Sequence, residues 1–283
     1  MQNPQIHILG VLLRPSTPEI KKDFLEFQSL AKDLGFEVLL DSISAGMIGM
    51  QGLDFSELCV KCDALVSLGG DGTLISTARR SFSYKKAILG VNMGNLGFLT
   101  DLQKEELEDF LPELKKGNYQ LQSHMMLEGV VDDKPFYALN DILLTRLSDS
   151  SMIHIKAYVD GEYFNSYHGD GLIIATPTGS TAYNISAGGA VVYPFSYNIL
   201  LTPICAHSLT QRPLILPGSF SVQAELGSEG KCSLIIDGQE NKTLNYGQKI
   251  NIKTIQNAIK LIHNHKWNYF KILKEKFHWG DFN

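Results

Sequence analysis

Apolar runs and helical periods alternate along the first part of the chain. Runs of β-branched and aliphatic residues predict strands, and apolar residues recurring every three to four positions predict helices. The predicted strands are Ile6–Leu13, Phe36–Leu40, Ala64–Leu68 and Ala87–Val91, and the predicted helices are Glu19–Leu34, Leu74–Arg80 and Lys104–Lys116. Gly35 and Gly117 stand where the first and last of these helices should end. This alternation favours a parallel sheet with helices on both faces.

After about Gln120 the strand-like segments follow one another with few long helices between them. They are Phe136–Leu144, Ile153–Val159, Glu162–Tyr167, Leu172–Thr176, Ser221–Leu226, Ser233–Asp237 and Lys249–Thr254. Asp160-Gly161 and Asp237-Gly238 predict two-residue hairpin turns. We therefore expect antiparallel sheets stacked face to face, with one short helix near Tyr183–Gly188.

Helical periodicity returns over Tyr269–His278, which predicts a C-terminal helix that packs back on the first domain. The expected domains are residues 1–120 with about 266–283, and residues 121–265. The first should be α/β and the second all-β. A length of 283 residues is enough for two such domains, each with its own core.

Composition places the chain among ordinary soluble proteins, with 44% hydrophobic and 19% charged residues. The net charge of −5, with no long run of Lys and Arg, argues against a nucleic-acid partner. No apolar stretch approaches the ~20 residues that span a bilayer, which argues against a membrane partner. The start, Met1–Gln5, lacks the features of a signal peptide, so we expect a cytoplasmic protein.

The four cysteines do not form a disulfide pattern. Cys59 and Cys62 have CxxC spacing, but no second pair or nearby His completes a zinc site. Cys205 and Cys232 lie far away within apolar runs. We expect reduced thiols with a structural role.

Gly69-Gly70-Asp71-Gly72-Thr73 follows the apolar run Ala64–Leu68 and carries the first candidate chemistry. Two glycines at a strand end let the backbone approach a ligand, and Thr73 is expected to cap the next helix, whose N–H groups suit phosphate. A carboxylate beside a phosphate would repel it unless the carboxylate serves a cation or removes a proton. Asp71 therefore indicates phosphoryl transfer rather than simple anion binding.

The second candidate segment is Gly169–Tyr183, where an apolar strand runs into a turn rich in Ser and Thr. Hydroxyls and free N–H groups in such a turn can contact phosphate, ribose or base edges. A turn that simply caps the following helix is the alternative. No GxxxxGK[ST] signature is present, and GxGxxG fails at Ile75, so a P-loop enzyme or an ordinary dinucleotide dehydrogenase is disfavoured.

These motifs together resemble those of NAD kinases. Gly69–Thr73, Gly94–Phe98, Asn140-Asp141 and Gly169–Tyr183 occur in the order seen in that family, and the resemblance covers nearly the whole chain. It implies transfer of the γ-phosphoryl group of ATP to the 2′-hydroxyl of the adenosine ribose of NAD, giving NADP. It also implies a Rossmann-like N-terminal domain, a C-terminal β-sandwich domain, Mg²⁺ or a similar divalent cation, and a homodimer or homotetramer.

The resemblance also implies roles for particular residues. Asp71 corresponds to the general base, with Gly72 beside it, although a helix-capping or loop-closing aspartate is the structural alternative. Asn140 and Asp141 correspond to a pair that holds ribose hydroxyls or an adenine edge. The alternative is that they form an Asx turn at a strand end, without a role in binding. Positions expected to contact the dinucleotide are Phe98, His168, Asp170, Thr181, Ala182, Tyr183, Ser186 and Gln239.

Several of these positions have particular expectations. Phe98 would stack on the adenine, unless it is a core residue. Asp170 would contact the nicotinamide end, in some members from a neighbouring subunit. His168 would lie near the NAD phosphates, unless it is an ordinary strand-end histidine, and Gln239 could be a plain hairpin residue. His207 would shape the site from behind.

Two other functions stay open at the level of sequence. Diacylglycerol and sphingosine kinases share the Gly-Gly-Asp-Gly-Thr loop and a similar two-domain plan, but they would need a wide apolar groove for lipid. A non-catalytic NAD(P)-binding sensor is the other alternative. Asp71 argues against a sensor, because a carboxylate beside phosphates weakens binding unless it takes part in chemistry.

Overall fold

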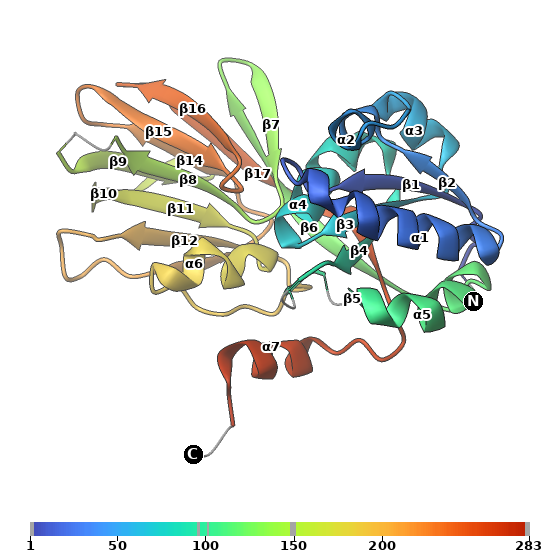
Figure 1. Cartoon of the computed structure of the whole chain (residues 1–283). Coiled ribbons are helices and arrows are strands. Elements are labelled where there is room, and N and C mark those ends of the chain that lie inside the picture. The colour runs from blue at the N-terminus through green and yellow to red at the C-terminus, as the bar shows by residue number, and fades with distance from the viewer. Residues whose placement is uncertain (1–2, 95–96, 101, 148–150, 281–283) are drawn as a thin grey trace. The chain divides into compact units, whose positions relative to one another are not determined.

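The computed structural model describes residues 3–94, 97–100, 102–147 and 151–280. The chain divides into two compact units, unit 1 formed by Met1–Ser123 and Ile259–Asn283, and unit 2 formed by His124–Ala258 (Figure 1). Asn95 and Leu96 of the predicted Gly94–Phe98 motif lie outside the described residues.

Unit 1 is built around a parallel sheet in the order β2-β1-β3-β4, extended beyond β4 by the last part of β17. Its strands are β1 (Ile8–Leu13), β2 (Glu37–Leu40), β3 (Ala64–Gly69), β4 (Ala87–Asn92) and β5 (Leu102–Gln103). Its helices are α1 (Lys21–Asp33), α2 (Ser42–Ile48), α3 (Phe55–Lys61), α4 (Asp71–Ser81), α5 (Leu107–Lys115) and α7 (Tyr269–Phe277).

Helices cover both faces of this sheet. On one face Val66 and Leu68 of β3 share a core with residues of α1 and α5, including Phe24 and Leu111. On the other face Gly90 of β4 leaves room for Leu74 of α4, because a Cβ there would overlap that side chain. Alternate residues of one strand point to opposite faces, so β3 is buried on both sides.

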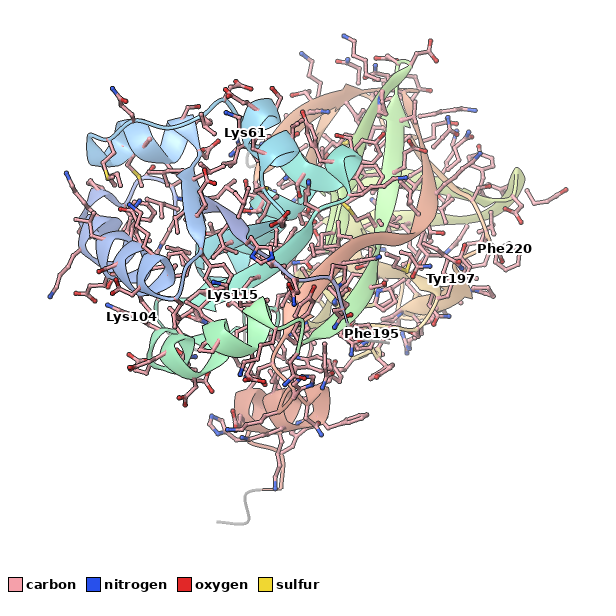
Figure 2. The ribbon with its side chains drawn as sticks, turned by 90° about the vertical axis from the view of Figure 1, so that its right-hand side faces the viewer. Lys61, Lys104, Lys115, Phe195, Tyr197 and Phe220 are labelled. Carbon is pink, nitrogen blue, oxygen red and sulfur yellow. The ribbon has the colours of Figure 1, made fainter. Side chains whose placement is uncertain are left out.

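Two lysines, Lys104 and Lys115, connect the region of α5 to α1, and both are labelled in Figure 2. Lys104 pairs with Asp23 and Glu26 of α1. Lys115 donates to the carbonyl of Leu34 at 2.6 Å and so satisfies an acceptor at the end of α1.

Unit 2 contains two antiparallel sheets, one in the order β10-β9-β14-β17 and the other in the order β13-β12-β11-β8-β15-β16. A further antiparallel pair joins β6 and β7. The strands are β6 (Gln120–Val131), β7 (Lys134–Ala138), β8 (Asp141–Arg146), β9 (Ile153–Val159), β10 (Glu162–Gly169), β11 (Gly171–Ala175), β12 (Asn198–Ile204), β13 (Leu214–Pro217), β14 (Val222–Leu226), β15 (Lys231–Ile236), β16 (Glu240–Asn245) and β17 (Lys249–His263).

The core of unit 2 lies between the two sheets. Ile155 of β9 and Val222 of β14 pack there with Leu172 and Ile174 of β11. Ile173 and Ala175 of β11 point to the opposite face, where they pack with the segment that follows α6 (Tyr183–Ser186). Because β11 is buried on both faces, it gives the turn after Ala175 a rigid support.

The predicted fold class is confirmed, with an α/β first unit and an antiparallel β-sandwich second unit. The two-residue turn at Asp160-Gly161 is confirmed between β9 and β10. Asp237-Gly238 also lies in a hairpin, between β15 and β16, but that loop has three residues, 237–239. The C-terminal helix α7 forms and belongs to unit 1.

Some element predictions are wrong. Phe136–Leu144 is not one strand but two, since β7 pairs with β6 while β8 pairs with β11 and β15. Two helices, α2 and α3, and five strands, β5, β6, β12, β13 and β16, were not predicted from the pattern. Strand β17 extends to His263, well beyond the predicted end at Thr254.

The cysteines are free, and three of them are buried. Burial raises the pKa of Cys59 to about 12 and the pKa of Cys62 to about 11. Thiols with such pKa values hold almost no thiolate at neutral pH and are poor nucleophiles.

Candidate active site

The glycine loop of unit 1 leads directly from β3 into α4. The helix begins at Asp71, with Gly70 as its N-cap, so the predicted cap by Thr73 is wrong. Thr73 instead lies in the first turn against Gly69, where any Cβ would overlap the threonine hydroxyl. A Cβ on Gly70 would meet nothing within 4 Å, so the backbone at this helix start faces open space.

The Asp71 carboxylate is held by four hydrogen bonds from a segment far along the chain. Oδ1 accepts the N–H of Leu99 at 3.1 Å, and the N–H and hydroxyl of Thr100 at 2.9 and 2.8 Å. Oδ2 accepts the N–H of Phe98 at 2.8 Å. An ionised carboxylate has about four acceptor positions, two on each oxygen, so these bonds fill Oδ1 and leave capacity on Oδ2.

A buried network behind Asp71 fixes this segment to the sheet. The side-chain amide of Asn92, at the end of β4, donates to the hydroxyl and carbonyl oxygens of Thr100 at 3.2 and 3.3 Å. Gly97 makes the close approach possible, because a Cβ there would overlap the Asp71 carboxylate. Asp71 therefore closes a loop, which was the structural alternative, and it does so with one oxygen left able to accept a proton.

In unit 2 the carboxylate of Asp237 organises the turn between β7 and β8. Its oxygens accept the N–H groups of Leu139, Asn140 and Asp141 at 2.9, 2.7 and 3.0 Å. These bonds end β7 and start β8, which explains why the predicted single strand is broken. Asp237 was predicted only as a turn residue, and its positive φ of 51° confirms that turn.

The same turn places Asn140 next to Asp141, and the two side chains differ in their hydrogen bonding and burial. Among the described residues, nothing donates to the buried Asn140 Oδ1. Asp141 is 5% exposed, and burial together with the negative charge of Asp237 raises the pKa of Asp141 from 3.8 to about 7. An unsatisfied amide oxygen and a carboxyl that titrates near neutral pH are typical of a binding site.

The raised pKa of Asp141 has a consequence for stability. The folded protein binds a proton that the unfolded chain releases, so the free energy of unfolding should fall as pH rises from about 4 to about 7. Between pH 5 and 8 this group should lower the free energy of unfolding by about 2.6 kcal/mol, and Asp141→Asn should abolish that part of the decrease. Urea unfolding of both proteins without ligand measures it. Parallel pH profiles for the two proteins would contradict the assignment.

The Ser/Thr-rich turn after β11 is supported by its own hydrogen bonds. The Thr176 hydroxyl donates to the Leu139 carbonyl at 2.6 Å and accepts the Gly179 N–H at 3.0 Å. Gly179 lies so close to the backbone of Asn140 that a Cβ would overlap it. The turn and the Asn140-Asp141 pair are thus built as one polar centre.

Asn184 holds the far end of this turn from inside. Its amide donates to the carbonyls of Ser180 and Ala190 at 3.0 and 3.1 Å, and its oxygen accepts the Thr202 hydroxyl at 2.6 Å. Sequence reasoning missed this residue. The Tyr183 side chain, by contrast, is 46% exposed and is available to a ligand. Thr181 and Ala182 are half-buried and Ser186 is exposed.

Of the other predicted dinucleotide contacts, Phe98 lies in unit 1, and Asp170, His168 and Gln239 lie elsewhere in unit 2. Asp170 accepts a hydrogen bond from Arg146 Nε at 2.7 Å. The His168 ring lies 4.0 Å from that of His154 and 5.3 Å from that of His207, and burial and these two rings lower the pKa of His168. Gln239 is exposed beside the Asp237-Gly238 turn. The roles of these residues in binding the dinucleotide stay predictions.

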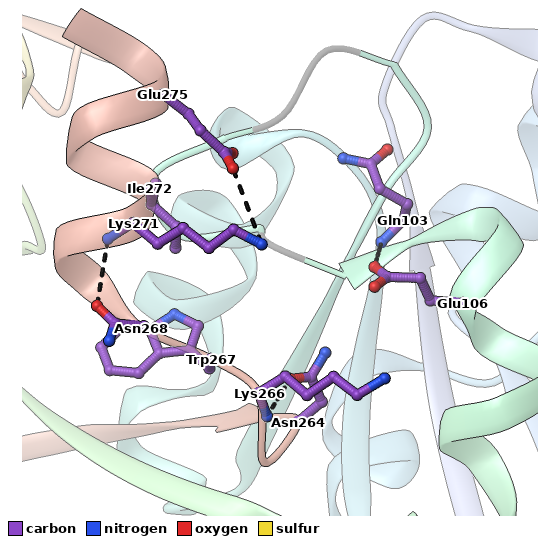
Figure 3. A pocket seen from close by; sticks show the side chains of 9 residues that line it. All are labelled: Gln103, Glu106, Asn264, Lys266, Trp267, Asn268, Lys271, Ile272 and Glu275. Atoms are coloured by element: carbon purple, nitrogen blue, oxygen red, sulfur yellow. Dashed lines mark hydrogen bonds and ion pairs between the residues drawn. The ribbon is translucent and has the colours of Figure 1, made fainter. Parts of the chain in front are cut away.

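A cavity of about 240 Å³ lies elsewhere in unit 1, between α7, the loop before it and the residues after β5 (Figure 3). Its lining contains none of the predicted site residues. The lining is Gln103, Glu106, Asn264, Lys266, Trp267, Asn268, Lys271, Ile272 and Glu275.

Sequence comparisons identify matching families. The family model for the ATP-NAD kinase N-terminal domain matches residues 53–119, and that for the ATP-NAD kinase C-terminal domain matches residues 139–264. The NAD kinase of Wolinella succinogenes is 54% identical over 277 residues, 96% of each chain. The NAD kinase of Helicobacter hepaticus is 46% identical, covering 99% of this chain and 98% of the relative.

Solved structures give the same result. A yeast NADH kinase complexed with NADH superposes with a TM-score of 0.89 at 26% identity, covering 100% of this chain and 90% of that one. An NAD kinase from Archaeoglobus fulgidus shares the fold, with a TM-score of 0.76 at 24% identity over 96% of this chain and 98% of that one. Within the described residues no helix is long and apolar enough to cross a membrane.

Proposed function

The chain belongs to the ATP–NAD kinase family, and we propose that it transfers the γ-phosphoryl group of ATP to the 2′-hydroxyl of the adenosine ribose of NAD, with Asp71 as general base. The resemblance noted from the sequence motifs is confirmed by these matches. They support neither the lipid-kinase alternative nor the non-catalytic sensor.

The observation that carries the proposed mechanism is the geometry of Asp71. Its Oδ1 is occupied by three hydrogen bonds, whereas Oδ2 accepts one from Phe98 and keeps a position for the substrate proton. In the step, the ribose 2′-oxygen attacks the γ-phosphorus, its proton passes to Oδ2, and ADP leaves. A secondary alcohol is a weak nucleophile, so a fixed carboxylate has a clear task.

The start of α4 is the proposed seat of the transferred phosphoryl group. The N–H groups of a helix's first turn carry partial positive charge. Gly70 leaves space in front of them, and Gly72 is exposed in that first turn. A phosphate there would be bound by backbone groups alone, without the lysine of a P-loop.

The polar centre of unit 2 is the proposed seat of the NAD acceptor. The unsatisfied Asn140 oxygen can accept a hydrogen bond from an adenine amino group or a ribose hydroxyl, and Asp141 can bind the ribose. Thr181, Ala182, Tyr183 and Ser186 supply hydroxyls, backbone groups and an exposed ring beside it. The structural similarity to a kinase that holds NADH supports a nicotinamide dinucleotide.

A divalent cation, Mg²⁺ by the family resemblance, fits this arrangement if it arrives on the nucleotide. Among the described residues no group of three His, Cys, Asp or Glu side chains could hold a metal ion. The phosphate oxygens of ATP would then supply most ligands, and the bound ion would neutralise charge on the transferring group.

Chelation tests the need for this cation. EDTA in excess over the metal should lower turnover by at least about 10²-fold, because uncompensated phosphate charge opposes transfer. Addition of Mg²⁺ should restore the rate. The same turnover with and without EDTA, using metal-free ATP, would contradict a cation requirement.

We further infer that the enzyme is a cytoplasmic homodimer or homotetramer that serves NADP biosynthesis. The resemblance to NAD kinases supports the assembly. Light scattering on the purified protein measures it directly, and a monomer at assay concentrations would contradict it. If a neighbouring subunit supplies Asp170, then mixing Asp170→Ala and Asp71→Asn proteins should recover part of the activity.

A coupled assay tests the proposed reaction. Purified protein receives ATP, Mg²⁺ and either NAD, NADH, a diacylglycerol or sphingosine, and NADP is followed with an NADP-specific dehydrogenase. NADP from NAD supports the proposal. Phosphorylation of a lipid without NADP formation would mean that the glycine loop was interpreted correctly and the acceptor site wrongly.

A further inference from the structure

The last turn of helix α7 contacts the segment that holds the proposed base. The ring of Phe277 lies 5.6 Å from the ring of Phe98 at an interplanar angle of 44°. Lys276 Nζ lies 5.7 Å from the centre of the Phe98 ring. The ring of Trp279 stacks on that of Phe277, with 5.2 Å between the ring centres and an interplanar angle of 29°. Such aromatic and cation–π contacts favour one position of the Phe98 ring.

Phe98 is also the residue that orients the free oxygen of Asp71. Among the described residues, its N–H is the single hydrogen-bond donor to Oδ2, while Leu99 and Thr100 bind Oδ1. Gly97, the residue before it, has no side chain, and its N–H donates to the Thr100 carbonyl at 3.2 Å. The ring of Phe98 is a second anchor for the N–H that points Oδ2.

Helix α7 has its own anchors, so it can act as a support. The Asn268 side chain caps it by accepting the N–H groups of Phe270 and Lys271 at 2.9 and 3.2 Å. Ile272 and Leu273 are buried in unit 1. At the other end His278 adopts a left-handed conformation with φ 54°, and the Trp279 N–H bonds to the Lys274 carbonyl at 3.2 Å.

The packing beneath α7 is incomplete along the side of the helix that runs from Asn268 to Glu275. The cavity of Figure 3 lies against Asn268, Lys271 and Glu275 on one side and against Gln103 and Glu106 on the other. The contact of Phe277 with Phe98 lies outside this cavity, because neither residue lines it.

We propose that Phe277 is a positioning residue for phosphoryl transfer. Through the ring of Phe98 it holds the Phe98 N–H on Asp71 Oδ2, and so aims the oxygen that receives the substrate proton. The proposal rests on the function proposed above, and it assigns α7 a task in the chemical step that is separate from substrate binding.

Phe277→Ala tests the proposal. It should lower kcat about tenfold, equivalent to about 1.4 kcal/mol in the activation barrier, with the KM for NAD and ATP changed by less than about twofold. Phe277→Tyr, which keeps the ring, should retain at least about half of the wild-type kcat. Phe270→Ala, on the same helix but with a side chain that is 66% exposed, is the matched control and should retain kcat.

A double mutant separates positioning from a general loss of stability. If Phe277 acts through Asp71, then Phe277→Ala should have no further effect on the residual rate of Asp71→Asn, measured at high enzyme concentration and well below both melting temperatures. A merely structural role would lower the residual rate by the same factor again.

Failure of the positioning role of Phe277 can be distinguished from failure of the proposed reaction. No NADP from the wild-type protein would contradict the function itself. If the wild-type protein forms NADP, an unchanged kcat in Phe277→Ala would overturn the positioning role. An effect of Phe277→Ala on KM alone would also overturn it. So would a double mutant in which Phe277→Ala lowers the residual rate of Asp71→Asn by the full factor seen in the wild-type background. If Phe277→Ala does not fold, Phe277→Leu keeps an apolar side chain and is judged by the same double mutant.

Discussion

Replacement of Asp71 by asparagine is expected to lower kcat for NADP formation by about 10³-fold, within the range typical of a lost general base. The amide cannot take the 2′-hydroxyl proton from the ribose. It also cannot accept all of the N–H and O–H donors that now surround the carboxylate. Steady-state kinetics with NAD, ATP and Mg²⁺ measure the effect.

The control must account for stability as well as chemistry. Loss of charged hydrogen bonds at Asp71 should lower the free energy of unfolding by about 2 kcal/mol, so rates are compared well below the melting temperature. Asp54→Asn is the matched variant, because Asp54 also lies at a helix start and accepts the Ser56 N–H at 2.9 Å. It should keep wild-type kcat. An Asp71→Asn enzyme with kcat within about twofold of wild type would remove Asp71 from the mechanism.

The second large effect is expected from Gly97→Ala. Its Cβ would overlap the carboxylate of Asp71 and the hydroxyl of Thr100, so one or both must move. Displacement of a reacting group by about 1 Å can cost about 10²-fold in rate, and we expect a decrease of that size in kcat. The loop itself should remain folded, because the Thr100 carbonyl still accepts a hydrogen bond from Asn92.

Gly46→Ala provides the comparison for this substitution. Gly46 lies inside α2, and a Cβ there would meet nothing within 4 Å. It should leave kcat unchanged and raise the free energy of unfolding by about 0.5–1 kcal/mol through helix propensity. Wild-type kcat in Gly97→Ala would show that the position of the Asp71 carboxylate does not limit the reaction.

The sequence was most informative where function and local pattern coincide. The apolar run before Gly69 and the glycine loop after it locate Asp71 without any structure, and the Asp-Gly pairs predict their hairpins from local backbone preferences. The alternation of apolar runs and helical periods predicts the fold class because burial on both faces leaves a readable pattern.

What the sequence could not show is set by distant contacts. The donors to Asp71 come from residues 27 to 29 positions away, and those to Asp237 from residues 96 to 98 positions away. Thr73 resembled a helix cap because the pattern does not reveal that α4 starts two residues earlier. Helices α2 and α3 were missed because each has only seven residues, although Asp41 and Asp54 are recognisable caps.

The identity of the phosphorylated product tests the central claim most directly. Wild-type protein is incubated with NAD, ATP and Mg²⁺, and the product is examined by phosphorus NMR and by reduction with an NADP-specific dehydrogenase. The account predicts one new phosphomonoester on the adenosine 2′-oxygen, formed together with an equal amount of ADP. Release of inorganic phosphate alone, or a phosphoryl group on any other acceptor, would contradict it.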